Sequence, residues 1–138
     1  MGMIQEVFSH TDTDGTVRHF SVPMLRASIR TRPDDWRLQT VPINRAFAAE
    51  IRRCSSVEEA RLKAYPLSKL DEPGIACIFP DTSVLVVDGS HRIVKRVARG
   101  LKEMRFWMAE QTVWQDCVVD GRDLMSLQTG QRHIAVRG

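Results

Sequence analysis

Asp88, Gly89, Ser90, His91 and Arg92 form a run whose residue types and spacing suggest ligand chemistry. An all-apolar stretch precedes the run and a basic segment with helical spacing follows it, so the run falls between a strand and a helix. Such a junction directs the free N–H groups of the first helical turn at one point. Ser90 is the predicted N-cap, with His91 and Arg92 as donors beside it. We therefore expect an anion site, and phosphate is the anion that this arrangement favours.

Asp88 has three possible roles at this junction. It can hydrogen-bond its own turn, as aspartate often does at the end of a strand. It can instead hold a divalent cation that bridges phosphate oxygens, or accept a proton from an attacking hydroxyl or water. Ser90 and His91 are not expected to act as a nucleophile and its base, because neighbours at a helix start point in different directions.

A basic cluster directly follows the turn, and it comprises Lys95, Arg96, Arg99 and Lys102. It is either the solvated face of an amphipathic helix or an extension of the phosphate-binding surface toward nucleic acid. The net charge of +3 and the isoelectric point near 9.0 are compatible with nucleotide or nucleic-acid partners.

Length and composition indicate a single globular domain, with 138 residues, 43% hydrophobic and 27% charged. No apolar run has the length of a membrane span, and the first residues lack the pattern of a secretory signal, so we expect a cytoplasmic protein without a membrane partner. The spacing of Cys54, Cys77 and Cys117 predicts reduced thiols rather than a zinc site. The oligomeric state stays open.

The positioning elements are predicted from periodicity and turn residues. Residues 6–22 read as a hairpin with the Asp14-Gly15 turn, and residues 23–36 as a strand or an irregular crossing segment. A strand over 38–43 precedes a helix that Asn44 caps, and a second helix is expected to start at Ser56, where Ser56 and Glu59 have capping-box spacing.

Two apolar strands follow, over 75–79 and 83–87, and they are expected to pair antiparallel in the middle of a sheet covered on both faces. The helix from His91 should end at Gly100, before a strand over 104–109. This order predicts an α+β domain, a mixed sheet with flanking helices. We expect an N-terminal hairpin extension over 1–37, a core over 38–116 and a C-terminal tail over 117–138.

The run over 83–101 resembles the ParB and sulfiredoxin superfamily, in which a strand, a glycine-containing turn and a helix follow one another. The likeness extends over residues 38–114. Its Asp-Gly-X-His-Arg form looks most like the free-serine kinases and the ParB-like proteins of phages and mobile elements. The resemblance implies that Gly89, Ser90, His91 and Arg92 contact nucleotide phosphates. It also implies that Asp88 handles a metal or a transferred group, and by analogy it makes Glu58 a catalytic candidate.

The resemblance implies a nucleotide-binding enzyme that hydrolyses or transfers a phosphoryl group, with ATP, ADP or CTP and Mg²⁺ as cofactors. One alternative is a DNA-binding module or weak nuclease of a phage or plasmid, with Lys95, Arg96 and Arg99 on the nucleic acid. Another is a non-catalytic interaction or inhibitor protein. Sulfiredoxin has a cysteine where Ser90 stands, so peroxiredoxin repair is not expected.

Overall fold

The computed structural model describes residues 3–55, 57–119 and 134–137. The chain divides into two compact units, Met1–Asp35 with Glu110–Gly138, and Trp36–Ala109. The predicted α+β class is confirmed, because each unit combines helices with its own sheet. Within the described ranges, no helix is long and apolar enough to span a membrane.

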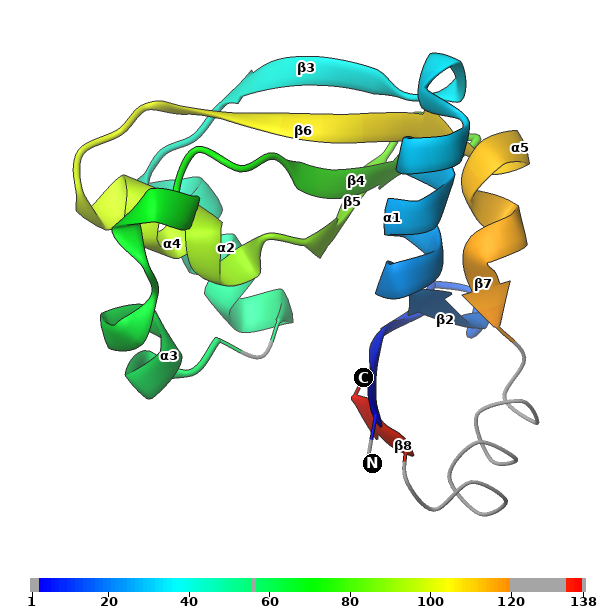
Figure 1. Cartoon of the computed structure of the whole chain (residues 1–138), viewed down its shortest axis with the longest axis horizontal. Helices are drawn as coiled ribbons and strands as arrows, with labels where there is room; N and C mark the ends of the chain where they lie inside the picture. Colours follow the sequence, from blue (N-terminus) through cyan, green and yellow to red (C-terminus); the bar gives the residue numbers. More distant parts are fainter. Residues whose placement is uncertain (1–2, 56, 120–133, 138) are drawn as a thin grey trace. The chain divides into compact units, whose positions relative to one another are not determined.

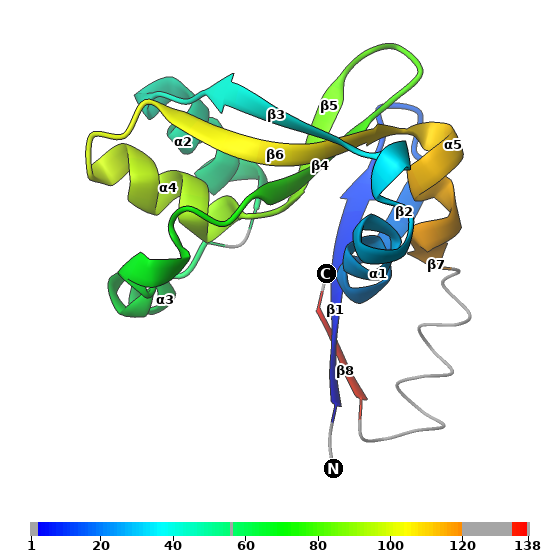
Figure 2. The same ribbon diagram turned by 45° about the horizontal axis from the view of Figure 1, so that its top comes forward.

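The sheet of the first unit has the strand order β7-β2-β1-β8. Strands β1 (Met3–Thr11) and β2 (Val17–Ser21) pair antiparallel around Gly15, whose φ is +89°, and this confirms the predicted hairpin. Strand β8 (Ile134–Arg137) runs parallel to β1, as Figure 2 shows. The short strand β7 (Val118–Val119) pairs with β2. The predicted tail thus supplies strands to this sheet, and its residues 120–133 lie outside the described part.

Residues 22–31 correct one expectation, because they form helix α1 (Val22–Thr31) rather than a strand or an irregular segment. The Ser21 hydroxyl accepts a hydrogen bond from the Met24 N–H, and Pro23 occupies the first turn, where its missing N–H costs nothing. Helix α5 (Gln111–Trp114) belongs to the same unit, and the Trp114 ring lies 5.3 Å from the ring of Phe20.

The sheet of the second unit has the order β3-β6-β4-β5 (Figure 1). Its strands are β3 (Arg37–Pro42), β4 (Gly74–Ile78), β5 (Val84–Asp88) and β6 (Glu103–Glu110). The antiparallel pairing of β4 with β5 is confirmed, but the expected central position of this pair is wrong for β5. Strand β6 takes the other side of β4, so β5 closes the row as an edge strand, and Val84 is 50% exposed.

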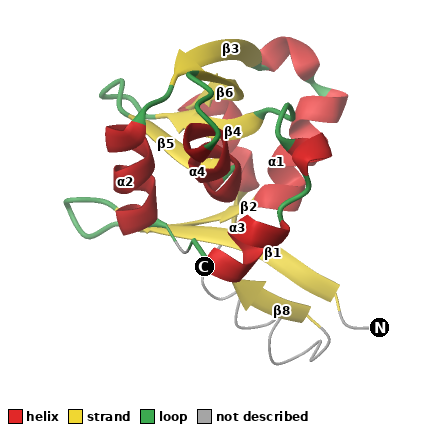
Figure 3. Cartoon of the chain, turned by 90° about the vertical axis from the view of Figure 1, so that its left-hand side faces the viewer, coloured by secondary structure: helices red, strands yellow, loops and turns green. Residues whose placement is uncertain are grey.

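Three helices complete this unit: α2 (Arg45–Cys54), α3 (Glu59–Ala64) and α4 (Ser90–Ala98). The predicted Asn44 cap is confirmed, since its side-chain oxygen accepts the Phe47 N–H at 2.8 Å. The predicted start of the second helix at Ser56 is wrong, because α3 begins at Glu59 with Glu58 as its N-cap. Ser56, and with it the predicted capping box, lies outside the described residues, and Glu59 pairs with Arg52. Helices α2 and α4 pack against each other (Figure 3).

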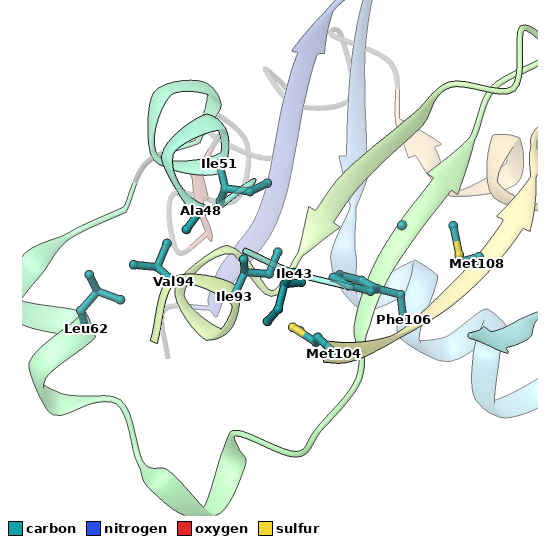
Figure 4. Packing of buried hydrophobic residues seen from close by; sticks show 10 residues of the cluster. Ile43, Ala48, Ile51, Leu62, Ile93, Val94, Met104, Phe106 and Met108 are labelled. Atoms are coloured by element: carbon teal, nitrogen blue, oxygen red, sulfur yellow. The ribbon is translucent and has the colours of Figure 1, made fainter. Parts of the chain in front are cut away.

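The core of the second unit lies between these helices and the sheet (Figure 4). Ile93 of α4 is fully buried, and Met104 and Phe106 of β6 are 2% exposed. The core holds one side of α4 firmly, so the start of this helix has a fixed place beside β5. The other buried members of the cluster are Ile43, Ala48, Ile51, Leu62, Ala76, Val94 and Met108.

Candidate functional site

The predicted junction is present, with one correction at the helix start. Asp88 ends β5, Gly89 is the N-cap of α4, and Ser90 is the first helical residue rather than the cap. Gly89 has φ +109° and ψ 11°, a left-handed conformation that L side chains rarely adopt. The first intrahelical hydrogen bond joins the Ile93 N–H to the Gly89 carbonyl at 2.9 Å. The N–H groups of the three preceding residues therefore lack an intrahelical acceptor, and a glycine cap offers no side chain to satisfy them.

Close backbone packing between Gly74 and Gly89 fixes this turn. A Cβ on Gly89 would lie 3.3 Å from the Gly74 Cα and 3.2 Å from the Met104 Cε. A Cβ on Gly74 would lie 2.7 Å from the Asp88 carbonyl oxygen and 2.8 Å from the Phe106 ring. Both positions therefore require glycine, and the start of β4 holds the turn between β5 and α4 in place.

His91 has a different role from the donor that the sequence predicts. Its side chain is 8% exposed, and its Nε2 accepts a hydrogen bond from the backbone N–H of Glu58 at 3.0 Å. We assign the ring proton to Nδ1 from this contact, because an Nε2 that accepts carries no proton. His91 thus brings Glu58, which is distant in sequence, to the first turn of α4.

Acid should weaken the fold through His91. Burial, and secondly the nearby Arg61 charge, hold the pKa of His91 below its ordinary value of 6.5, while Glu58 acts in the opposite direction. The unfolded chain therefore takes up the proton first, and the free energy of unfolding should fall as the pH drops below about 6.5. Urea unfolding between about pH 7.5 and 5 should show this loss.

The variant His91→Gln should remove much of that acid loss, because a glutamine oxygen accepts the Glu58 N–H without titrating. His19→Gln is the matched control, because His19 lies in the first unit and its ring contacts Ser9 instead. An acid loss that is identical in the parent chain and in His91→Gln would contradict this role of His91.

Arg92 also lies inside the protein, 7% exposed, and two of its three side-chain nitrogens donate to protein acceptors. Its Nε donates to the Tyr65 hydroxyl at 2.8 Å, and its Nη1 donates to the Pro73 carbonyl at 3.0 Å. Its Nη2 lies 3.9 Å from the Glu72 carboxylate. The guanidinium therefore fastens the chain before β4 to α4. The backbone N–H groups of the first helical turn are the donors that remain for the predicted anion site.

The basic cluster is divided between two environments. Lys95 donates to the Leu62 carbonyl at 2.8 Å, and Arg96 donates to the carbonyls of Leu70 and Glu103 at 2.7 and 2.9 Å. Arg99 is exposed. Lys95 and Arg96 thus satisfy backbone carbonyls of α3, of residue 70 and of β6. Arg99 is the solvated member of the predicted nucleic-acid surface.

Two predicted acidic residues of the site are Asp88 and Glu58. Asp88 is half-buried at the end of β5, and Glu58 is exposed at the N-cap of α3. Among the described residues, no group of three or more His, Cys, Asp or Glu side chains can hold a metal ion. The described residues therefore do not form a metal site made of protein ligands alone. Mg²⁺ is usually bound by one or two carboxylates together with the phosphates of a substrate.

Comparison with known proteins adds no family to this geometry, since no family model, curated protein or solved structure matches the chain.

Sequence reasoning missed Tyr65 and the Pro73 carbonyl as partners of Arg92. The Pro73-Gly74 pair carried a signal, because a glycine that opens a buried strand often marks a close backbone approach. Nothing local in the sequence pointed to Tyr65.

Proposed function

We propose that the first turn of α4 binds the phosphates of a nucleotide, and that the chain hydrolyses or transfers a phosphoryl group there. The observation that carries the proposal is the glycine-capped start of α4, whose first N–H groups follow a left-handed Gly89. The resemblance of residues 83–101 to the ParB and sulfiredoxin superfamily supports it. Because Lys95 and Arg96 are occupied by backbone carbonyls, we favour a nucleotide over DNA as the ligand.

Asp88 and Glu58 supply the acidic groups of this proposal. Their carboxylate oxygens are the hard ligands that Mg²⁺ prefers, so Asp88 is the residue proposed to hold the ion beside the phosphates. Bound Mg²⁺ would neutralise charge on the phosphate oxygens. Glu58, which His91 holds by its backbone, is proposed to accept a proton from the attacking water or hydroxyl.

Calorimetric titration tests the proposal with Mg²⁺ and ATP, ADP or CTP, and with inorganic tripolyphosphate as a probe without a base. At least one nucleotide should give saturable heat, and Ser90→Glu should weaken its binding by at least about tenfold. A carboxylate in the first turn occupies the anion position and repels phosphate, while it favours the helix dipole and so preserves the fold.

The matched control is Ala46→Glu, which places the same charge in the first turn of α2, where Ala46 is exposed. This variant should bind within about twofold of the parent chain, because surface charges far from the ligand are screened by salt. Two results would contradict the proposal: no heat with any of the four ligands, or equal losses in Ser90→Glu and Ala46→Glu.

A further inference from the structure

A pocket of about 220 Å³ lies in the second unit. Two residues of its lining also lie beside the 88–92 turn: Glu72 is 3.9 Å from the Arg92 Nη2, and the Met104 Cε would be 3.2 Å from a Cβ on Gly89. Its lining comes in part from the chain before β4 and from the start of the neighbouring strand β6. Strands β3 and β6, helix α4 and the segment 70–72 form its walls. The residues that matter for its chemistry are Thr40, Asp71, Arg96, Glu103 and Arg105.

Two guanidinium groups connect the walls of this pocket through hydrogen bonds to backbone carbonyls. Arg96 donates from Nε and Nη2 to the Glu103 carbonyl at 2.9 and 2.5 Å, and from Nη1 to the Leu70 carbonyl at 2.7 Å. Arg105 donates from Nη2 to the Asp71 carbonyl at 2.6 Å. Hydrogen bonds from charged donors are the strong ones, so the pocket is built into the fold rather than opened by a ligand.

Glu103 and Arg105 are the two charged groups of the pocket that keep capacity for a ligand, whereas Arg96 and Asp71 are paired with each other. The side chain of Arg96 is 14% exposed and its donors are engaged, and Asp71 is paired with it at 3.3 Å. Arg105 is exposed, and its Nη2 donates to the Asp71 carbonyl. The exposed Glu103 lies two residues earlier on the same face of β6, and the register pairs Thr40 directly with Arg105.

The charges of the pocket select against a simple ion. An anion would meet the carboxylates of Asp71 and Glu103, and a cation would meet the guanidinium groups of Arg96 and Arg105. A neutral planar ligand with hydrogen-bond donors on one part of its edge and acceptors on the next part satisfies both Glu103 and Arg105. Residues i and i+2 of a strand are about 7 Å apart, a span that suits the edge of a purine.

We infer that this pocket binds the guanine base of a nucleotide. Guanine has two donors side by side, its N1–H and its N2 amine, and a carboxylate can accept both hydrogen bonds. It also has two acceptors side by side, O6 and N7, to which a guanidinium can donate. Glu103 takes the first pair and Arg105 the second. The inference rests on the proposed nucleotide function, because it names the base of that nucleotide.

Nucleosides test the pocket without the phosphate site, because they carry no phosphate. In calorimetric titrations of the whole chain, guanosine should bind at least about tenfold more tightly than adenosine, and more tightly than inosine, which lacks the N2 amine. Glu103→Gln and Arg105→Met should each weaken guanosine binding by at least about tenfold. The first of these variants keeps the backbone carbonyl that Arg96 needs.

The matched control is Arg99→Met, which removes an exposed arginine of α4 that does not line the pocket and should leave guanosine binding unchanged. Guanosine carries no phosphate, so a failure of the proposed phosphate site is distinguishable from a failure of the pocket. Guanosine that does not bind, or that binds no better than adenosine, would overturn the inference. A guanine oligonucleotide that binds at least about tenfold more tightly than GTP would also overturn it, by assigning the pocket to nucleic acid.

Discussion

Gly74→Ala should destabilise the protein by about 3 kcal/mol, a large part of the stability of a domain of this size. The new Cβ would lie 2.7 Å from the Asp88 carbonyl oxygen and 2.8 Å from the Phe106 ring. Neither neighbour can move easily, because Asp88 ends β5 and Phe106 is 2% exposed in the core. Urea unfolding of the variant and the parent chain measures the effect as a shift of the midpoint.

Gly100→Ala is the matched control for this change. Gly100 has φ +80°, but a Cβ there meets nothing within 4 Å, so the variant carries backbone strain without a clash. Its cost should be about 1 kcal/mol. If Gly74→Ala lowers the free energy of unfolding no more than Gly100→Ala does, the close packing of Gly74 against Asp88 and Phe106 does not limit the size of residue 74.

Arg92→Met should cost about 2–4 kcal/mol, because it keeps much of the apolar stem and removes every donor of the guanidinium. The Tyr65 hydroxyl and the Pro73 carbonyl would lose their partner, and the Tyr65 ring would lose the guanidinium 5.9 Å from its centre. Arg92→Lys should recover only part of the loss, since one ammonium cannot reproduce the planar fork. Urea unfolding again provides the measurement.

Arg99→Met changes an exposed arginine of the same helix and should cost less than about 0.5 kcal/mol. A double-mutant cycle of Arg92→Met with Tyr65→Phe isolates the contact between these two side chains. Additive losses in the cycle, or equal losses in Arg92→Met and Arg99→Met, would contradict the fastening role of Arg92.

This role decides which variant can test the function. A ligand that fails to bind Arg92→Met could reflect a loosened turn as well as a missing phosphate contact. Ser90→Glu avoids that ambiguity, because Ser90 is the first residue of α4 and a carboxylate there is favourable to the helix. The proposed phosphate site is therefore tested best at Ser90, the residue at the start of the helix.

Much of the fold could be predicted because its signals are local. Asp14-Gly15 defines a hairpin turn and Asn44 defines a helix start through chemistry within a few residues, and both predictions are confirmed. Helix α1 was not predicted although Ser21 and Pro23 are a recognised start signal, because arginines interrupt its apolar residues. The edge position of β5 was not predictable in this way, since it depends on where the later strand β6 inserts.

The candidate site was predictable in its backbone and not in its side chains. The strand, the glycine and the helix start follow from residues 84–92, and only the N-cap shifted, from Ser90 to Gly89. The partners of His91 and Arg92 come from residues between α2 and β4, far away in the sequence. Whether an arginine faces a ligand or a buried carbonyl is decided by such long-range contacts, which no local pattern encodes.

The most direct test of the proposed phosphate site is the amide NMR spectrum of the chain during titration with tripolyphosphate and Mg²⁺-nucleotide. If the first turn of α4 binds phosphate, the backbone N–H signals of Ser90, His91 and Arg92 should shift saturably with both ligands. The shifts should vanish in Ser90→Glu and persist in Ala46→Glu. Unchanged N–H signals for these three residues, at concentrations that saturate binding elsewhere in the chain, would contradict the site.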